Sequence, residues 1–135
     1  MSRTLQLSSS PVHISTRANA SFEVLDWFKF DESSWQRYVT DHCSSEDPGC
    51  IVIEETSPAS WPTWECHPKG DELVIVLAGR GTFYQQLEGA EVAMPFQEGD
   101  TILNPRGVWH TADVTEAMRA IYITTCPDTD HKPRA

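Results

Sequence analysis

The chain has 135 residues, enough for one folded domain with a buried core but too few for two. Hydrophobic residues make up 39% and charged residues 22%, which is typical of a folded globular protein and excludes a disordered one. Twenty acidic residues against ten basic ones give a formal net charge of −10, which repels phosphate backbones and anionic lipids, so we expect no nucleic-acid and no membrane partner.

We expect no targeting signal in the N-terminal segment. Its first 15 residues contain one arginine and lack the apolar core of a signal peptide. No apolar run in the chain approaches the ~18–20 residues needed to span a bilayer. We therefore expect a cytoplasmic protein.

The next part of the chain predicts short strands and one helix. Apolar stretches between residues 12 and 30 indicate strands that cover an edge of a larger sheet. Residues 31–34, Asp-Glu-Ser-Ser, offer N-cap oxygens and early acidic charge, and apolar residues at helical spacing follow. These features predict one short helix at about residues 33–40. The polar residues 41–49 predict a loop.

From residue 50 onward the pattern alternates between strands and turns. We expect strands over residues 50–55, 61–67, 72–77, 82–87, 90–94, 101–103, 108–114 and 118–125. Gly79, Gly81 and Gly107 are expected to be turn residues with positive φ. Short strands at this spacing predict an all-β sandwich or barrel. With no internal repeat or linker, residues 1–135 are expected to form a single domain.

Four polar residues are placed to form a metal site. Glu65 and His67 are two apart on one expected strand, so both side chains leave the same face. Glu72 opens the next strand, and because antiparallel neighbours lie ~4.8 Å apart, we expect it beside His67. His110 follows a Pro-x-Gly turn on a later strand, which closure of a barrel would carry to the opposite side. Two imidazoles and two carboxylates suit a divalent ion such as Zn, Mn, Fe or Ni.

The same residues carry a family resemblance. The stretch from Glu65 to Glu72, with Gly79 seven residues further on, resembles the first cupin motif: His-x-His, three or four residues, Glu, six residues, Gly. The form Trp-Glu-x-His-Pro-x-Gly-Asp-Glu is similar to that of a subgroup of small bacterial cupins. The C-terminal residues 131–134, His-Lys-Pro-Arg, also fit the tail of that subgroup.

The second cupin motif has a matching stretch as well. Gly99, the Pro-Arg-Gly at residues 105–107 and His110 resemble the pattern Gly, five residues, Pro-x-Gly, two residues, His. The resemblance spans about residues 50–125. It implies a small single-domain cupin of the RmlC-like jelly-roll superfamily, a double-stranded β-helix barrel, here with N-terminal strands and a short helix at residues 12–40.

The resemblance also implies a ligand set. In cupins the positions of His67, Glu72 and His110 are metal ligands. The family's first histidine is Glu65 here, and the asparagine expected after the last histidine is Val114. Glu65 therefore has two readings: a carboxylate ligand, or a hydrogen-bonding carboxylate beside the pocket that serves as catalytic general base.

Several functions remain open at this stage because one barrel fold hosts many activities. The first hypothesis is a metal-dependent oxygenase, isomerase or lyase acting on a small anionic or polar molecule. The second is a non-catalytic module that binds a sugar or organic acid, with or without a metal. The third is a degenerate cupin in which Glu65 marks a lost metal site.

The remaining expectations concern histidines and assembly. Histidines outside the motifs are interpreted as structural: His13, His42 and His131. Trp64 and Trp109 alternate with ligand positions and should face away from the pocket. Apolar outward positions predict a homodimer, the alternative being that N-terminal strands cover them within one chain. These positions are Trp64, Leu73, Ile75 and Leu77, with Tyr84 and Trp109 beside them.

Overall fold

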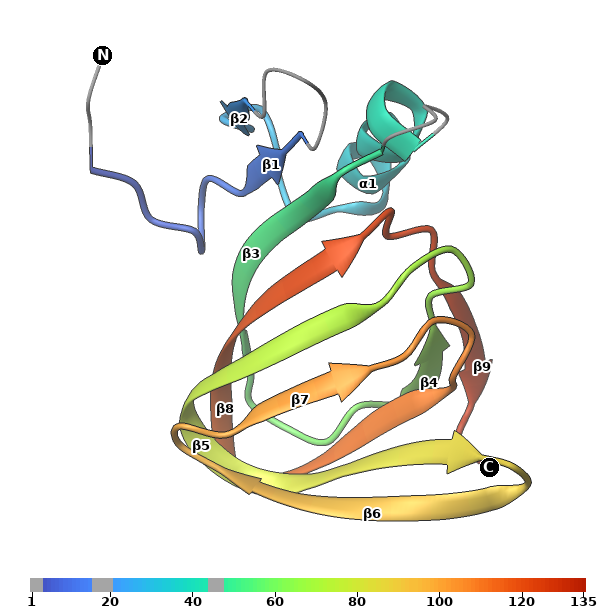
Figure 1. Cartoon of the computed structure of the whole chain (residues 1–135). Coiled ribbons are helices and arrows are strands. Elements are labelled where there is room, and N and C mark those ends of the chain that lie inside the picture. The colour runs from blue at the N-terminus through green and yellow to red at the C-terminus, as the bar shows by residue number, and fades with distance from the viewer. Residues whose placement is uncertain (1–3, 16–20, 44–47) are drawn as a thin grey trace.

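The computed structural model describes residues 4–15, 21–43 and 48–135. Most of this chain is one antiparallel sheet rolled into a barrel (Figure 1). The strands of the barrel are β3 (Cys50–Ser57), β4 (Thr63–Cys66), β5 (Glu72–Leu87), β6 (Ala90–Gln97), β7 (Thr101–Asn104), β8 (His110–Thr125) and β9 (Asp130–Pro133). The all-β barrel expected from the sequence is therefore confirmed.

Two long strands organise the barrel. β8 pairs with β5 over most of its length and with β3 through residues 118–125, while β5 also pairs with β7 and then β6. The sequence predicted that Gly79 and Gly81 would end a strand, which is wrong: β5 continues through them. Register shifts between Val76 and Gly81 show why, since bulges let one strand bend around a barrel without ending.

The two glycines at this bend have different roles. Gly79 has a φ of +100°, as expected, and this backbone conformation favours glycine. Gly81 does not have the expected positive φ. A Cβ atom there would lie 2.0 Å from the backbone oxygen of Asp113 on β8, so Gly81 is required by the close approach of two strands. Gly107 has the predicted positive φ of +77°.

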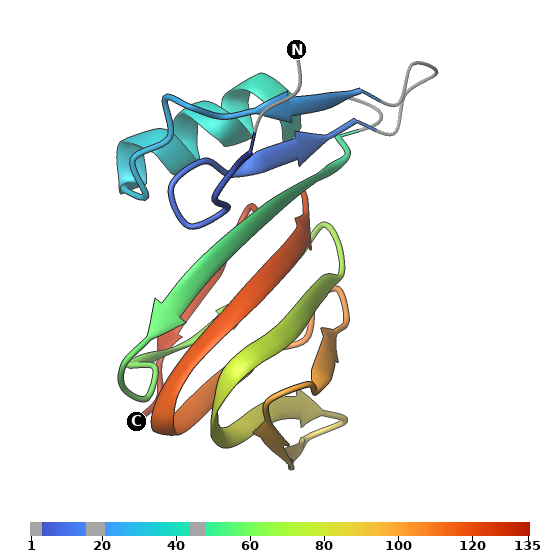
Figure 2. The same cartoon turned by 90° about the vertical axis from the view of Figure 1, so that its left-hand side faces the viewer.

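The N-terminal elements lie at one end of the barrel (Figures 1 and 2). They are β1 (Val12–Ile14), β2 (Phe22–Val24), α1 (Glu32–Tyr38) and the π-helical turn η1 (Val39–Cys43). β1 pairs with β3, so the expected strand at the sheet edge is present. The predicted loop at residues 41–49 is wrong for residues 41–43, which belong to η1, and its residues 44–47 lie outside the described residues.

The helix forms where the sequence predicts it. Asp31 caps it by accepting a hydrogen bond from the backbone N–H of Ser34 at 2.8 Å. The helix begins at Glu32, and its continuation beyond Tyr38 is π-helical rather than α-helical. Tyr38 is buried, and its hydroxyl is hydrogen-bonded to Nδ1 of His13 at 2.6 Å. This hydrogen bond holds the helix against β1. No helix among the described residues is long and apolar enough to cross a membrane.

One apolar cluster joins the N-terminal elements to the barrel. Because the same cluster contains residues from the helix region and from the long strands, the helix has a fixed position over that end of the barrel. Its fully buried members include Leu25, Tyr38, Ile51, Val74, Phe83 and Met118.

The structure corrects one expectation about the outer surface. Trp64 is only 5% exposed, so it does not offer an apolar surface to a partner. It lies on β4 between β8 and the C-terminal strand β9, which pairs Trp64 with Lys132. The sequence did not predict β9, and this strand gives β4 a neighbour on its open side.

Candidate metal centre

Glu65, His67, Glu72 and His110 all lie at the barrel end that faces α1. Glu65 is on β4, and its cross-strand partner is His110, the first residue of β8. Antiparallel pairing therefore places these two residues side by side. His67 directly follows β4, and its backbone oxygen accepts a hydrogen bond from Gly107 in the turn before β8. The structure thus brings all four predicted residues together.

The expected pairing of Glu72 with the strand of His67 is wrong. β4 pairs with β8 and β9, and Glu72 opens β5, whose neighbours at this residue are β7 and β8. Glu72 still reaches His67 because only the turn at residues 68–71 separates the two residues along the chain. The Oε2 atom of Glu72 lies 3.1 Å from Nε2 of His67, and its Oε1 atom lies 3.4 Å from Nε2 of His110.

The four side chains converge on a small volume. One donor atom from each of Glu65, His67 and His110 lies within 4.8 Å of the other two. Oε2 of Glu65 is 3.9 Å from Nε2 of His110. The imidazole of His110 is fully buried and that of His67 nearly so, whereas the Glu65 side chain is 30% exposed. Glu65 is therefore the member of the set that reaches solvent in the cavity.

The Nε2 atoms of both histidines are buried and have no hydrogen-bond partner in the described structure. Nδ1 of His110 donates to the backbone oxygen of Val108 at 3.3 Å. The hydroxyl of Thr129 donates to the backbone oxygen of Pro127, so Nδ1 of His67, 3.0 Å away, donates to Thr129. These contacts leave both Nε2 lone pairs free for a ligand, which is the usual arrangement of metal-binding histidines. The residues present fit a divalent metal ion.

The electrostatics separate the roles of the two carboxylates. Burial raises the pKa of Glu65, and the charge of Glu72 adds to the effect. Burial acts on Glu72 in the same direction, but the close imidazole of His67, with His110 and Thr124 adding to its effect, outweighs burial and lowers the pKa of Glu72. Glu72 is therefore the member of the pair that stays ionised to the lower pH.

The two imidazoles also differ. Burial lowers the pKa of His110 and so favours the neutral form of this ring. Burial opposes a charge on His67 as well, but the neighbouring carboxylates of Glu72 and Glu65 outweigh it and raise the pKa of His67. A neutral imidazole is the form that binds a metal, and His110 has this form over the wider pH range.

Three polar residues that the sequence did not single out hold Glu72 in place. Asn104 on β7 donates to Oε1 at 3.1 Å, and Thr124 on β8 donates to Oε2 at 2.8 Å. Gln85 in turn donates to the side-chain oxygen of Asn104 at 3.0 Å. Asn104 and Thr124 are both cross-strand partners of Glu72, so only the sheet register reveals them.

His131, interpreted from the sequence as structural, lies at the site. β9 pairs with β4 so that His131 is the cross-strand partner of Glu65. Its Nε2 atom is 3.5 Å from Oε1 of Glu65. His13 and His42, by contrast, stack on each other with ring centroids 3.8 Å apart beneath α1, in keeping with a structural role.

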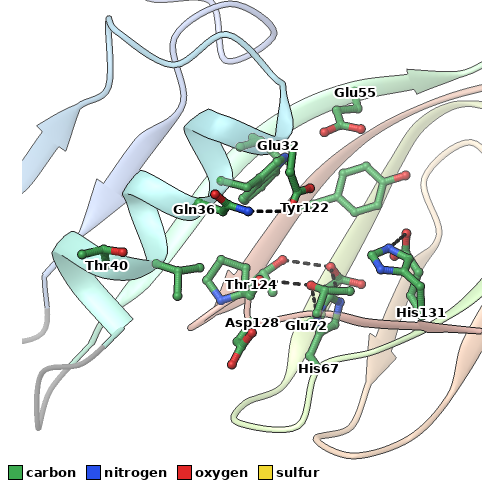
Figure 3. Close-up of a pocket in the computed structure, with 16 residues that line it drawn as sticks. Glu32, Gln36, Thr40, Glu55, His67, Glu72, Tyr122, Thr124, Asp128 and His131 are labelled. Atoms are coloured by element: carbon green, nitrogen blue, oxygen red, sulfur yellow. Dashed lines mark hydrogen bonds and ion pairs between the residues drawn. The ribbon is translucent and has the colours of Figure 1, made fainter.

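A cavity of about 600 Å³ opens from these residues towards α1 (Figure 3). Neither Trp64 nor Trp109 lines it, as strand alternation predicted. The cavity lies between the barrel end and the helix, and both contribute polar side chains. Its lining consists of Glu32, Trp35, Gln36, Val39, Thr40, Ile53, Glu55, Glu65, His67, Glu72, Tyr122, Thr124, Pro127, Asp128, Thr129 and His131.

Comparison with known protein families shows to which family this chain belongs. Residues 52–126 match the cupin domain family, which is more than half of the 135-residue chain. The chain belongs to the cupin family. The match covers every strand from β4 to β8 and so contains the four residues of the candidate metal centre.

Solved structures of similar fold include several enzymes. A Streptomyces nucleoside dehydratase, Pac13, shares 19% identity at a TM-score of 0.55, with 66% of this cupin and 72% of that chain covered. Variants of it were solved with uridine. An uncharacterised Klebsiella pneumoniae protein with a double-stranded β-helix domain shares 15% identity at a TM-score of 0.51, covering 62% and 73% of the two chains. No curated protein matches the sequence. These likenesses show the shared fold.

The network around Glu72 leads to a stability prediction. Asn104→Ala removes the donor to a buried carboxylate and also leaves the amide of Gln85 without that acceptor. We expect the free energy of unfolding to fall by about 1–3 kcal/mol, the cost of leaving buried polar groups unpaired. Denaturant titration measures it. Thr101→Ala, an exposed position on the same strand β7, is the control and should change stability by less than about 0.5 kcal/mol. Equal losses in the two variants would contradict the role assigned to Asn104.

Proposed function

We propose that this cupin binds a divalent metal ion through His67, Glu72 and His110, with Glu65 beside them, and acts on a small polar molecule in the cavity. The observation that carries the proposal is the pair of buried Nε2 atoms without hydrogen-bond partners, both directed at carboxylate oxygens. Leaving buried polar atoms unpaired costs stability, so such a pair indicates a ligand.

The donor set restricts the metal. Two imidazole nitrogens with one or two carboxylate oxygens suit Mn, Fe, Ni or Zn, whereas Mg and Ca prefer oxygen alone. When bound, such an ion supplies Lewis-acid polarisation of a substrate oxygen. The cavity next to the site leaves room for a small molecule to approach. A barrel of the same fold solved with uridine supports a small molecule as the occupant.

The chain's own residues perform the remaining tasks. Asn104 and Thr124 orient the Glu72 carboxylate, and Val108 and Thr129 orient the two imidazoles. Glu65 is partly exposed in the cavity and has a raised pKa, which are the properties of a proton-transferring group. We therefore propose Glu65 as the catalytic general base if it does not itself bind the metal.

A metal-free binding protein is the alternative function. The observation that favours it is the position of Glu72, whose two oxygens already approach both imidazoles at 3.1 and 3.4 Å. In this arrangement the Glu72 carboxylate balances the charge of a protonated histidine, and no metal ion is needed. In this case the cavity would hold a sugar or other small molecule without catalysis, and metal analysis distinguishes the two functions directly.

The metal site predicts a specific loss in one variant. Wild-type protein purified without chelator and then exposed to Zn²⁺ or Mn²⁺ should bind about one ion per chain. His110→Gln should lose most of it, a drop in affinity of more than about 100-fold, because it removes a ligand rather than an outer contact. Elemental analysis and calorimetric titration measure both. His42→Gln, a histidine outside the site, should bind the metal like wild type, and circular dichroism checks the fold of each variant. Negligible metal in wild type would rule out the metal-dependent function.

The role of Glu65 can be tested with two substitutions. If Glu65 is a ligand, Glu65→Gln should bind metal poorly, whereas Glu65→His, which restores the usual cupin residue, should bind it at least as tightly as wild type. Co(II) absorption spectra should then differ between wild type and Glu65→Gln. If the three proteins bind metal indistinguishably, Glu65 is not a ligand. Loss of turnover in Glu65→Gln with unchanged metal affinity would identify it as the base.

We also propose that the whole chain forms one domain and assembles as a cytoplasmic homodimer without nucleic acid or membrane partners. The outer face of β5 and β7 carries Leu73, Ile75 and Leu77 beside Leu103, which is 55% exposed. Light scattering should find a dimer at micromolar concentration, and Leu103→Lys should weaken it. Val92→Lys, at an exposed apolar position on β6, is the control. A wild-type monomer under these conditions would contradict the dimer.

A further inference from the structure

We propose that the cavity selects a small organic cation, an amine or quaternary ammonium compound, over neutral and anionic molecules of the same shape. The inference takes the cavity to be the binding site named above but does not depend on the metal. It deepens the proposed function by naming the class of ligand, and it departs from the anionic substrate or organic acid that the sequence left open.

The charge of the cavity wall is the first observation. The lining contains the carboxylates of Glu32, Glu55, Glu65, Glu72 and Asp128, and not one lysine or arginine among the described residues. Acidic residues are enriched here, because they are five of the sixteen lining residues but only 20 of the 135 residues of the chain. Asp128 is paired with Lys69 at 3.3 Å outside the lining. The other four carboxylates form no ion pair with Lys or Arg in the described ranges.

Glu55 places one of these carboxylates on the cavity wall, at a solvent-exposed position. It lies on β3 next to Glu54, and strand alternation points the two side chains to opposite faces. Glu54 contacts Arg119 at 3.4 Å, whereas Glu55 faces the cavity. Burial raises the pKa of Glu55, and the charges of Glu65 and Glu72 add to the effect. A cation bound nearby would relieve this repulsion.

Opposite Glu55, α1 places a further carboxylate and an aromatic ring on the cavity wall. Glu32 and Trp35 both line the cavity, and Tyr122 lines it from β8. Figure 3 shows Glu32, Glu55 and Tyr122 around the same space, away from His67. Carboxylates combined with aromatic faces are the groups that recognise organic cations, through ion pairing and cation–π attraction.

Ligands of other charge fit this wall less well. An anionic ligand would find no basic side chain except the histidines and would be repelled by Glu32 and Glu55. A neutral polyol can donate hydrogen bonds to the carboxylates of Glu32 and Glu55, but it gains no charge attraction from them. The buried Nε2 atom of His67, which lines the cavity and has no hydrogen-bond partner in the described structure, is a separate sign that this cavity holds a ligand.

The test compares probes that differ only in charge. Choline is compared with 3,3-dimethylbutan-1-ol, its neutral isostere, and with 3,3-dimethylbutanoate, an anion of the same shape. A primary amine, 3-aminopropan-1-ol, is compared with butan-1-ol. Affinities are measured by ligand-observed NMR titration on the full chain, with and without Zn²⁺. We expect at least one cation to bind about tenfold more tightly than its neutral partner, and the anion to bind most weakly.

Variants then assign the preference to the cavity wall. Glu55→Gln and Glu32→Gln should each reduce the preference for the cation by about threefold or more, because each removes one unpaired negative charge near the site. Glu54→Gln, on the same strand but facing Arg119, is the matched control and should leave it unchanged. An undiminished preference for the cation in both Glu55→Gln and Glu32→Gln would overturn the assignment.

The outcomes separate this inference from the proposed function. Equal binding of cation and neutral isostere in both pairs, or tighter binding of the anion, overturns the inference even when the protein binds Zn²⁺. A clear preference for the cation in protein that binds no metal supports the inference while the metal-dependent function fails.

Discussion

The carboxylate of Glu72, at the first residue of β5, is the group on which the candidate site depends. It is almost fully buried and ionised, so it requires compensation by hydrogen bonds and positive or polar neighbours. Thr124 and Asn104 provide two hydrogen bonds from β8 and β7, and the imidazoles of His67 and His110 approach its two oxygens. A charge buried in this way ties four separate segments of the barrel to one point.

The bent strands make this convergence possible. β5 and β8 each run for 16 residues, and the bulges near Gly79 allow them to curve around the barrel and still start at the same end. Gly81 permits the close approach of the two strands at the bend. Glu72 and His110 are the first residues of these strands, so the geometry of the strands places both at the barrel end that α1 covers.

The N-terminal elements turn the open barrel end into a cavity. The shared apolar cluster, together with the hydrogen bond between His13 and Tyr38, holds α1 over the candidate metal centre. The helix contributes Glu32 and Trp35 to the wall, while β9 brings His131 beside Glu65. The barrel strands supply the proposed metal ligands, and the two ends of the chain supply much of the surface that a bound molecule would meet.

The sequence by itself determined the β-barrel class, the short helix and the four residues that converge, because alternation, turn residues and motif spacing are local patterns. It failed where neighbours far apart in the chain decide the outcome. Gly79 and Gly81 read as turns but lie within a bulged strand, since only the curvature of the barrel shows that β5 continues. Asn104 and His131 gave no local signal. Their roles come from cross-strand register with Glu72 and Glu65, and register is a property of the folded sheet.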